Sequence, residues 1–159
     1  MQIVREEYHR ALGSLYGLAI GNALGMPTQM MDRATVQQLF PQFKTFYPGP
    51  AQNWISHGQP VGKVTDGTEQ AIILARRLIA GQGRVDSLQF VAELLSWAQE
   101  AETNGSDQLG PSSRRGPQAV QNGTPPEVTG GHGHANGTAM RIAPTGIAAR
   151  FSVLASGRP

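Results

Sequence analysis

The amino-acid sequence predicts an all-α protein, on three observations. Apolar residues recur at spacings of three and four in several segments, which is the period of an amphipathic helix. No segment shows the convincing apolar–polar alternation of a strand. Glycine and proline are frequent, with 20 and 11 residues, and they gather between the helical segments, where they predict extensive irregular backbone.

The first predicted helix runs from about Glu6 to Leu24, and Pro27 ends it. Its apolar residues follow helical spacing: Tyr8, Leu12, Leu15, Ala19 and Ala23. Glycines also recur at every fourth position and form a second ridge: Gly13, Gly17, Gly21 and Gly25. Each glycine costs a helix about 1 kcal/mol relative to alanine. The ridge therefore predicts either tight packing of another helix or the close approach of a ligand.

Two further helices are predicted in the first half of the chain. Asp32 is the expected cap of a short helix at about Arg33 to Phe40, and Pro41 to Val64 is expected to be mostly loop. The next helix is expected at about Thr68 to Ala80 and is stopped by glycines at 81 and 83. Its expected core face consists of Ala71, Leu74, Ala75 and Leu78.

In the second half of the chain, glycines and prolines interrupt the predicted helices more often. Asp86 or Ser87 caps a predicted helix that runs to about Ala101 and is apolar on two sides, which is typical of a helix buried in a multi-helix core. Residues 103–137 contain eight glycines and four prolines, so a long loop with one short helix near residues 114–120 is expected. A last helix is predicted over residues 137–154, interrupted at Pro144.

Composition narrows the classes of function. The net charge is only +2, and the basic pairs have no interleaved aromatic residues, so we expect no nucleic-acid partner. The uncharged run from Ala11 to Met31 is interrupted by glycines, an asparagine and a proline, which makes it a poor membrane span or secretory signal. The chain has no cysteine, which excludes disulfides and thiolate metal sites. A cytoplasmic protein without a membrane partner is expected.

The sequence Thr65-Asp66-Gly67-Thr68, at the beginning of a predicted helix, has two interpretations. Thr65 or Asp66 could be the N-cap, and if Asp66 is the cap, Glu69 would complete a capping box. Alternatively, Thr65 and Asp66 could be what remains of a metal site. The two interpretations are compatible with each other.

Four segments together resemble the ADP-ribosylglycohydrolase family, which includes the dinitrogenase reductase-activating glycohydrolases. They are GLAIGNALGMPTQ (17–29), TDGTEQAI (65–72), GPSSRRG (110–116) and NGTAMRIAPTG (136–146). The last of these is the most specific, and the order of the four extends the resemblance from Ala11 to about Phe151.

The resemblance implies a compact multi-helix core in which two Mg²⁺ ions assist hydrolysis of the bond to ADP-ribose. The expected partner is ADP-ribose or an ADP-ribosylated protein; the sequence does not indicate an oligomeric state. We expect residues 1–159 to form a single, partial domain, with a Gly/Pro-rich loop at about 103–137. The family's late cluster of aspartates has no counterpart before Pro159, so this domain is expected to be a truncated N-terminal part, incomplete at its C-terminus.

The match to the family's catalytic and metal positions is incomplete. Asn22 stands at the position of a family aspartate, Gln29 at that of the glutamate often given a catalytic role, and Gly67 at that of a second metal-binding aspartate. Thr65 and Asp66 match the remaining metal ligands of this motif, and Asp66 is also the surviving candidate for a catalytic carboxylate. Glutamine cannot accept a proton as a general base, and glycine offers no ligand atom. Impaired Mg²⁺ binding and impaired hydrolysis are expected.

The segments expected to bind substrate are better preserved. By resemblance they include Gly110, Ser112, Asn136, Gly137, Thr138, Ala139, Met140 and Arg141. Loops that enter helices present free backbone N–H groups to phosphates. The alternative is that Asn136 only caps a helix and Arg141 only covers its surface. His132 and His134 lie in a Gly-rich loop, where they are a weak signal for a metal site.

Three hypotheses about function remain open from the sequence. The first is an active hydrolase of ADP-ribosyl bonds, and the second is a pseudoenzyme that binds ADP-ribose or a related nucleotide without turnover. The third is an incomplete product with no stable function, because a helix apolar on two sides would lack part of its packing surface.

Overall fold

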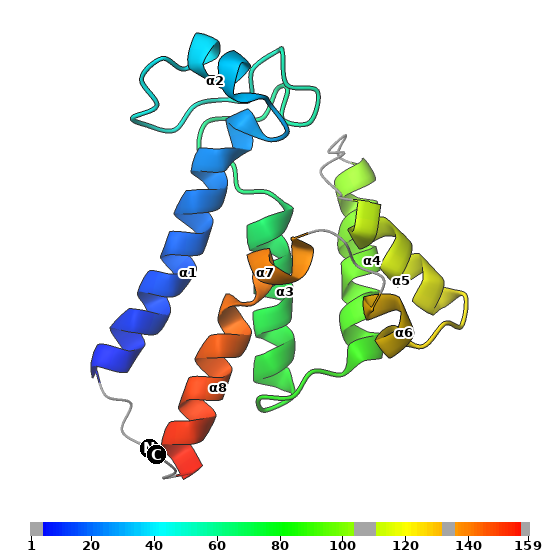
Figure 1. The fold of residues 1–159 in the computed structure, drawn as a ribbon. Helices are drawn as coiled ribbons and strands as arrows, with labels where there is room; N and C mark the ends of the chain where they lie inside the picture. The colour runs from blue at the N-terminus through cyan, green and yellow to red at the C-terminus, as the bar shows by residue number, and fades with distance from the viewer. Residues whose placement is uncertain (1–4, 104–110, 132–135, 157–159) are drawn as a thin grey trace.

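The computed structural model describes residues 5–103, 111–131 and 136–156, and these form only helices and loops (Figure 1). The predicted all-α class is confirmed: no strand occurs in the described ranges. The helices are α1 (Arg5–Gly25), η1 (Met26–Thr28, a 3-10 turn), α2 (Arg33–Leu39), α3 (Asp66–Ala80), α4 (Ser87–Thr103), α5 (Pro111–Gln121), α6 (Pro126–Gly130), α7 (Gly137–Arg141) and α8 (Ala143–Ser156).

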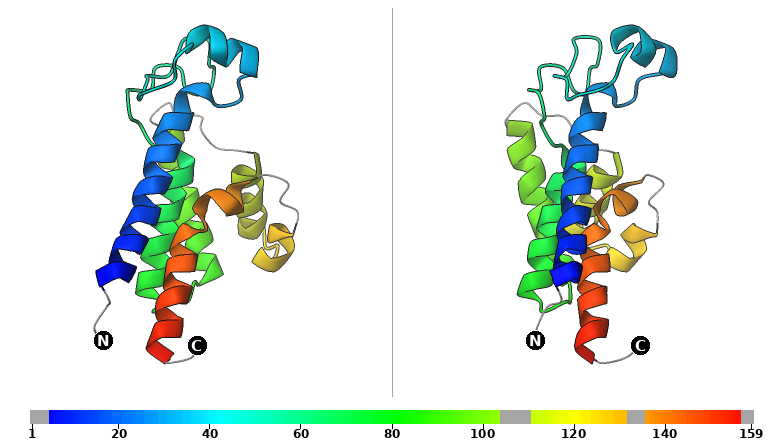
Figure 2. Two further views of the ribbon diagram at one scale, coloured as in Figure 1. Left: turned by 60° about the vertical axis from the view of Figure 1, so that its left-hand side comes forward. Right: turned by 90° about the vertical axis from the view of Figure 1, so that its left-hand side faces the viewer.

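Helix α3 is the centre of the fold. It contacts α1, α4, α7 and α8, and Figures 1 and 2 show α1, α3 and α8 side by side with α4 beyond α3. The predicted core face is largely right, since Ala71, Leu74 and Leu78 are buried and Ala75 is half-buried. Burial of such side chains stabilises the fold by about 1.5–3 kcal/mol for each large aliphatic residue.

Local sequence signals account for most helix boundaries. Asp32 caps α2 as predicted, because its carboxylate accepts a hydrogen bond from the Thr35 N–H at 3.0 Å. Asp86 is the cap of α4, with its Oδ1 accepting from the Leu88 and Gln89 N–H groups. The predicted break near Pro144 is confirmed and separates α7 from α8 at Ile142.

The structure differs from the sequence expectations in three places. Residues 103–137 hold more helix than predicted, since α6 was missed and α5 is longer than expected. The glycine ridge of α1 is exposed. Apart from the adjacent residues and the backbone of α1 itself, no described atom comes within 4 Å of a Cβ built at any of its four glycines. Finally, Leu94 is the buried residue of α4 and Leu88 is 63% exposed, so the second apolar side of this helix faces solvent in part.

The loop between α2 and α3 folds over the end of α1 (Figure 1). Phe40, Phe43 and Tyr47 form an aromatic cluster with ring centroids 4.9–5.4 Å apart. The loop closes so tightly at Gly49 that a Cβ there would lie 1.5 Å from the Ser56 carbonyl oxygen, so only glycine fits. Among the described helices, none is long and apolar enough to cross a bilayer.

Candidate functional site

The end of α1 meets the beginning of α3 in a cluster of polar side chains centred on Thr65. Asn22 on α1 makes several of the hydrogen bonds of this cluster. The Asn22 Oδ1 accepts from the Thr65 N–H at 2.6 Å and from the Thr68 hydroxyl at 2.9 Å. The Asn22 Nδ2 donates to the Thr65 Oγ1 at 2.6 Å. Thr65 is fully buried and Thr68 nearly so, so Asn22 satisfies groups that water does not reach.

Gln29 joins this cluster from the turn that follows α1. Its Nε2 donates to the Thr65 Oγ1 at 3.4 Å. Its backbone carbonyl accepts from the Nδ2 of buried Asn53 at 2.9 Å, and the same Nδ2 also reaches the Pro27 carbonyl at 3.1 Å. Asn53 therefore positions Gln29. The sequence reasoning missed it, since an asparagine in a loop rich in proline and glycine is ordinary turn chemistry.

Gly67, which the resemblance predicts to stand at a metal-binding position, also adjoins this cluster. A Cβ built at Gly67 would lie 3.4 Å from the Asn22 Nδ2 and 3.8 Å from the Met140 Sδ. Positions 22 and 67 therefore face each other, and both adjoin Thr65. A side chain at position 67 would enter the cluster rather than point to solvent.

Asp66 contributes a single carboxylate beside this cluster. Burial raises the pKa of Asp66 above its ordinary value of 3.8, while hydrogen bonds with Thr65 and the Gly67 backbone oppose the rise. The charge of Glu69 raises the pKa of Asp66 further, and the charge of Arg141 lowers it. Asp66 thus combines partial burial with one opposite charge nearby, a combination common at functional sites.

Arg141 on α7 turns inward toward α3 rather than covering the surface of its own helix. Its Nη1 donates to the Oε1 of Gln70, which is fully buried, and its guanidinium carbon lies 5.8 Å from the centre of the Phe90 ring. Burial lowers the pKa of Arg141, and the charge of Asp66 raises it. The guanidinium therefore anchors α7 to α3 at the edge of the polar cluster.

The predicted capping box at the start of α3 does not form. Thr65, not Asp66, occupies the N-cap position, and its side chain makes no capping bond; its carbonyl accepts from the Thr68 and Glu69 N–H groups. The Glu69 carboxylate instead binds the Lys63 Nζ at 3.0 Å and the Trp97 Nε1 at 2.7 Å. Glu69 is drawn away from the helix end because these two charged or polar donors offer stronger bonds than its own backbone.

The predicted substrate segment Asn136 to Arg141 lies next to the cluster, because α7 packs on α3. Asn136 takes the N-cap position of α7 without a side-chain capping bond and is exposed, as are Thr138 and Ala139, whereas Met140 is half-buried. Gly110, His132 and His134 fall outside the described residues. Ser112 belongs to α5, and its side chain is not described.

The side chains of this cluster do not suit a pair of divalent cations. The Asn22 oxygen already accepts two hydrogen bonds, Asn22 and Gln29 both present N–H groups to Thr65, and position 67 has no ligand atom. Asp66 alone supplies a carboxylate, whereas Mg²⁺ sites are built from hard oxygen ligands with carboxylates among them. In the ranges that the structure describes, no group of three His, Cys, Asp or Glu side chains could hold a metal ion.

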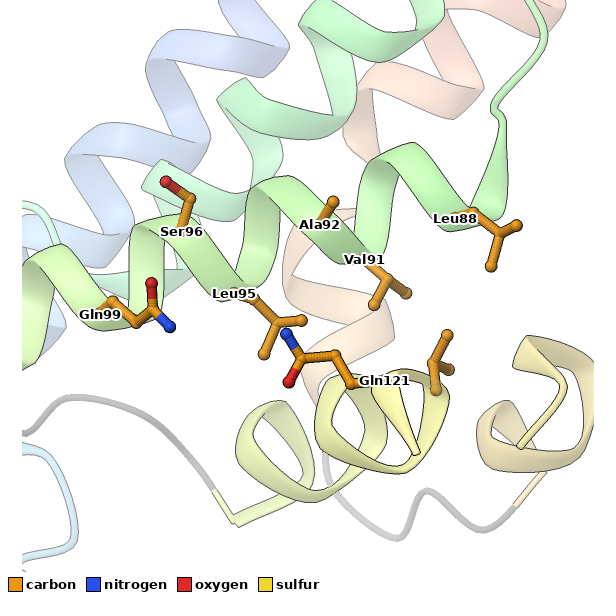
Figure 3. A pocket seen from close by; sticks show the side chains of 8 residues that line it. Leu88, Val91, Ala92, Leu95, Ser96, Gln99 and Gln121 are labelled. Atoms are coloured by element: carbon orange, nitrogen blue, oxygen red, sulfur yellow. The ribbon is translucent and has the colours of Figure 1, made fainter. Parts of the chain in front are cut away.

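A pocket of about 340 Å³ lies elsewhere, between α4 and α5 (Figure 3). Apolar side chains dominate its lining: Leu88, Val91, Ala92, Leu95 and Val120. The remaining lining residues are Ser96, Gln99 and Gln121, and none of them is charged. This pocket shares no residue with the polar cluster around Thr65, so it contributes no acid, base or metal ligand to that cluster.

Known proteins resemble this chain over most of its length. The family model for ADP-ribosylglycohydrolase matches residues 4–156. An uncharacterized protein of Escherichia coli, YegU, is 34% identical over 137 residues, which cover 86% of this chain and 41% of that protein. An ADP-ribosyl-[dinitrogen reductase] glycohydrolase of Rhodospirillum rubrum is 30% identical over 144 residues, covering 89% of this chain and 45% of that enzyme. The chain spans less than half the length of these relatives. Since the family match covers nearly all of it, the chain belongs to the ADP-ribosylglycohydrolase family.

Proposed function

We propose that this chain recognises ADP-ribose, or an ADP-ribosylated protein, without two-metal hydrolysis. One observation carries the proposal. The positions at which the chain departs from the family's acidic pattern, Asn22, Gln29 and Gly67, converge on a single cluster around Thr65. The side-chain amides of Asn22 and Gln29 bond to Thr65 there, and Gly67 has no side chain, so the three positions supply no carboxylate for metal ions.

The binding part of the proposal rests on the segment beside that cluster. Asn136 to Arg141 matches the most specific motif of the resemblance, and α7 packs directly on α3. Exposed residues at its start and the cationic side chain at its end suit an anionic ligand such as a diphosphate. The expected cytoplasmic location, where nucleotide ligands are plentiful, belongs to the same proposal.

Loss of turnover follows from the chemistry of the side chains. Gln29 is neutral at any pH and cannot take a proton from water. Asp66 is a single carboxylate and cannot offset the charge of two divalent ions. The residues of this cluster can therefore orient a ligand. Among Asn22, Gln29, Thr65, Asp66 and Gly67, only Asp66 could accept a proton from water.

A second candidate, an active hydrolase, is favoured by the family match itself and by the surviving Thr65-Asp66 pair. Two assays on the full chain separate the candidates. Calorimetric titration should show ADP-ribose binding of equal affinity in Mg²⁺ and in EDTA. Release of free ADP-ribose from a mono-ADP-ribosylated protein should not exceed the buffer blank, with the Rhodospirillum rubrum enzyme as positive control. Release that EDTA abolishes would establish the hydrolase instead. No binding at millimolar ADP-ribose, together with no release, would refute both functions.

A further inference from the structure

Met30 and Trp54 are large apolar residues that are exposed to solvent beside the polar cluster. Trp54 is 77% exposed and Met30 is 84% exposed. Each directly follows a partner in the hydrogen bond from the Asn53 Nδ2 to the Gln29 carbonyl, which is 2.9 Å long. The backbones of Met30 and Trp54 therefore lie close together, and we refer to the pair as the Met30–Trp54 surface.

The turn that carries Trp54 is held by the residue before it. The Asn53 Oδ1 accepts from the Ile55 and Ser56 N–H groups at 3.0 and 3.2 Å. Asn53 is 2% exposed, so these bonds are shielded from water. A turn that is fixed before binding lowers the entropic cost of placing its side chains against a partner.

Met30 stands on an unusual backbone conformation. Its φ is 57°, in the left-handed region that residues other than glycine adopt rarely, at a cost of about 1–3 kcal/mol. The Met31 N–H closes this turn by donating to the Thr28 carbonyl at 3.1 Å, and Asn53 holds the Gln29 carbonyl just before it. The turn therefore keeps a flexible apolar side chain exposed where glycine would meet less strain.

The composition around this surface suits a polypeptide partner. The charged residues of segment 27–62 are only Asp32, Arg33 and Lys44. The cores of protein–protein interfaces are depleted in charged residues and enriched in aromatic residues and methionine. Phosphate groups are bound instead by cationic side chains, above all arginine. The surface therefore fits apolar side chains of a protein better than it fits a diphosphate.

We propose that the Met30–Trp54 surface binds the polypeptide part of an ADP-ribosylated protein, next to the modified side chain. The proposal rests on the proposed function, recognition of ADP-ribose. Gln29 joins the two places, because its Nε2 donates to the Thr65 Oγ1 at 3.4 Å and its carbonyl accepts from Asn53. A protein attached to an ADP-ribose bound beside the cluster therefore lies next to the surface, and apolar residues around its modified side chain strengthen binding.

The test compares two short synthetic peptides, each with one ADP-ribose on a central arginine. They differ only in the flanking residues, which are leucine in one and serine in the other. Calorimetric titration of the full chain gives the affinities of both peptides and of free ADP-ribose. We expect the leucine peptide to bind about tenfold more tightly than the serine peptide, and Trp54→Ala to reduce this preference to less than about threefold. Met30→Gly should reduce the preference as well, and neither variant should change the affinity for free ADP-ribose.

Ile79→Ala is the matched control. Ile79 is 79% exposed but lies on α3 rather than on this surface, so its truncation should leave the preference for leucine intact. Exposed side chains contribute little to stability, so the midpoint of thermal unfolding (Tm) of Trp54→Ala should stay within about 2 °C of the wild-type value. Should Trp54→Ala fail to fold, Met30→Gly decides by the same comparison of peptides.

Equal binding of the two peptides, or a preference that Trp54→Ala leaves intact, would overturn the proposal. A loss of affinity for free ADP-ribose in Trp54→Ala would also overturn it, because the indole would then contact the nucleotide itself. Self-association in sedimentation velocity that Trp54→Ala abolishes would assign the surface to a second copy of the chain instead. If neither the peptides nor free ADP-ribose bind, the proposed function fails and this inference fails with it.

Discussion

Replacing Asn22 with alanine tests whether this side chain joins α1 to α3. The change removes three hydrogen bonds: two accepted from the Thr65 N–H and the Thr68 hydroxyl, and one donated to the Thr65 Oγ1. Thr65 is fully buried and Thr68 is 6% exposed, so water cannot replace these bonds without opening the cluster.

The magnitude follows from the groups left without a partner. The Thr65 backbone N–H becomes a buried, unsatisfied donor, at a cost of about 1–3 kcal/mol. The two hydroxyls can rotate to other acceptors, so they contribute less. We expect a total loss of about 2–4 kcal/mol in the free energy of unfolding, which lowers Tm by about 5–15 °C for a chain of this size.

Urea denaturation followed by circular dichroism measures this loss directly. Ser14→Ala is the matched control, because Ser14 lies on the same helix, is exposed and should change stability by less than about 0.5 kcal/mol. If Asn22→Ala unfolds at the same urea concentration as Ser14→Ala, the hydrogen bonds of Asn22 do not hold the two helices together.

Three further predictions use the same purified chain. Burial raises the pKa of Asp66 above 3.8, so the folded state binds this proton more tightly than the unfolded state does, and the free energy of unfolding falls as pH rises from 3.8 through the folded pKa. Asp66→Asn should remove this fall and raise Tm at pH 7. A pH profile of stability that is the same in the variant would refute the raised pKa of Asp66. Glu69→Ala should cost about 1–3 kcal/mol in the free energy of unfolding and shift Trp97 fluorescence to the red, because water takes the place of the carboxylate at the indole N–H; an unshifted spectrum would contradict the contact. Introducing acidic residues at the three positions that the resemblance identifies should destabilise the chain in EDTA and let Mg²⁺ raise Tm. A Tm that does not change with Mg²⁺ would show that these positions do not form a metal site. These substitutions are Asn22→Asp, Gln29→Glu and Gly67→Asp.

The fold class was predictable because it rests on local signals. The apolar spacing of the helix beginning at Asp66, the cap at Asp32 and the break before Pro144 each act within a few residues. Helix α6 was missed because its five residues, 126–130, include a proline and a glycine and carry too little apolar periodicity to stand out. The exposed glycine ridge of α1 shows that spacing alone does not reveal what a helix face contacts.

The motifs indicate which candidate residues to compare, but they do not indicate the hydrogen bonds among them. The motif order identified Asn22, Gln29, Thr65 and Gly67, and the structure brings them together. The positioning role of Asn53 depends on a loop that closes 24 residues away from Gln29, and no local pattern encodes such a contact. The choice of partners for Arg141 and Glu69 is likewise tertiary, since each is drawn to a donor or acceptor on another element.

The most direct test of a metal-independent ADP-ribose site is a ¹H–¹⁵N correlation spectrum of the full chain, titrated with ADP-ribose and then with Mg²⁺. We expect dispersed signals, saturable shifts of the amides of Asn136 to Arg141 on addition of ADP-ribose, and no shift of the Thr65 to Thr68 amides on addition of Mg²⁺. Saturable Mg²⁺ shifts at Asp66, or signals at Asn136 to Arg141 that ADP-ribose leaves unmoved, would contradict it.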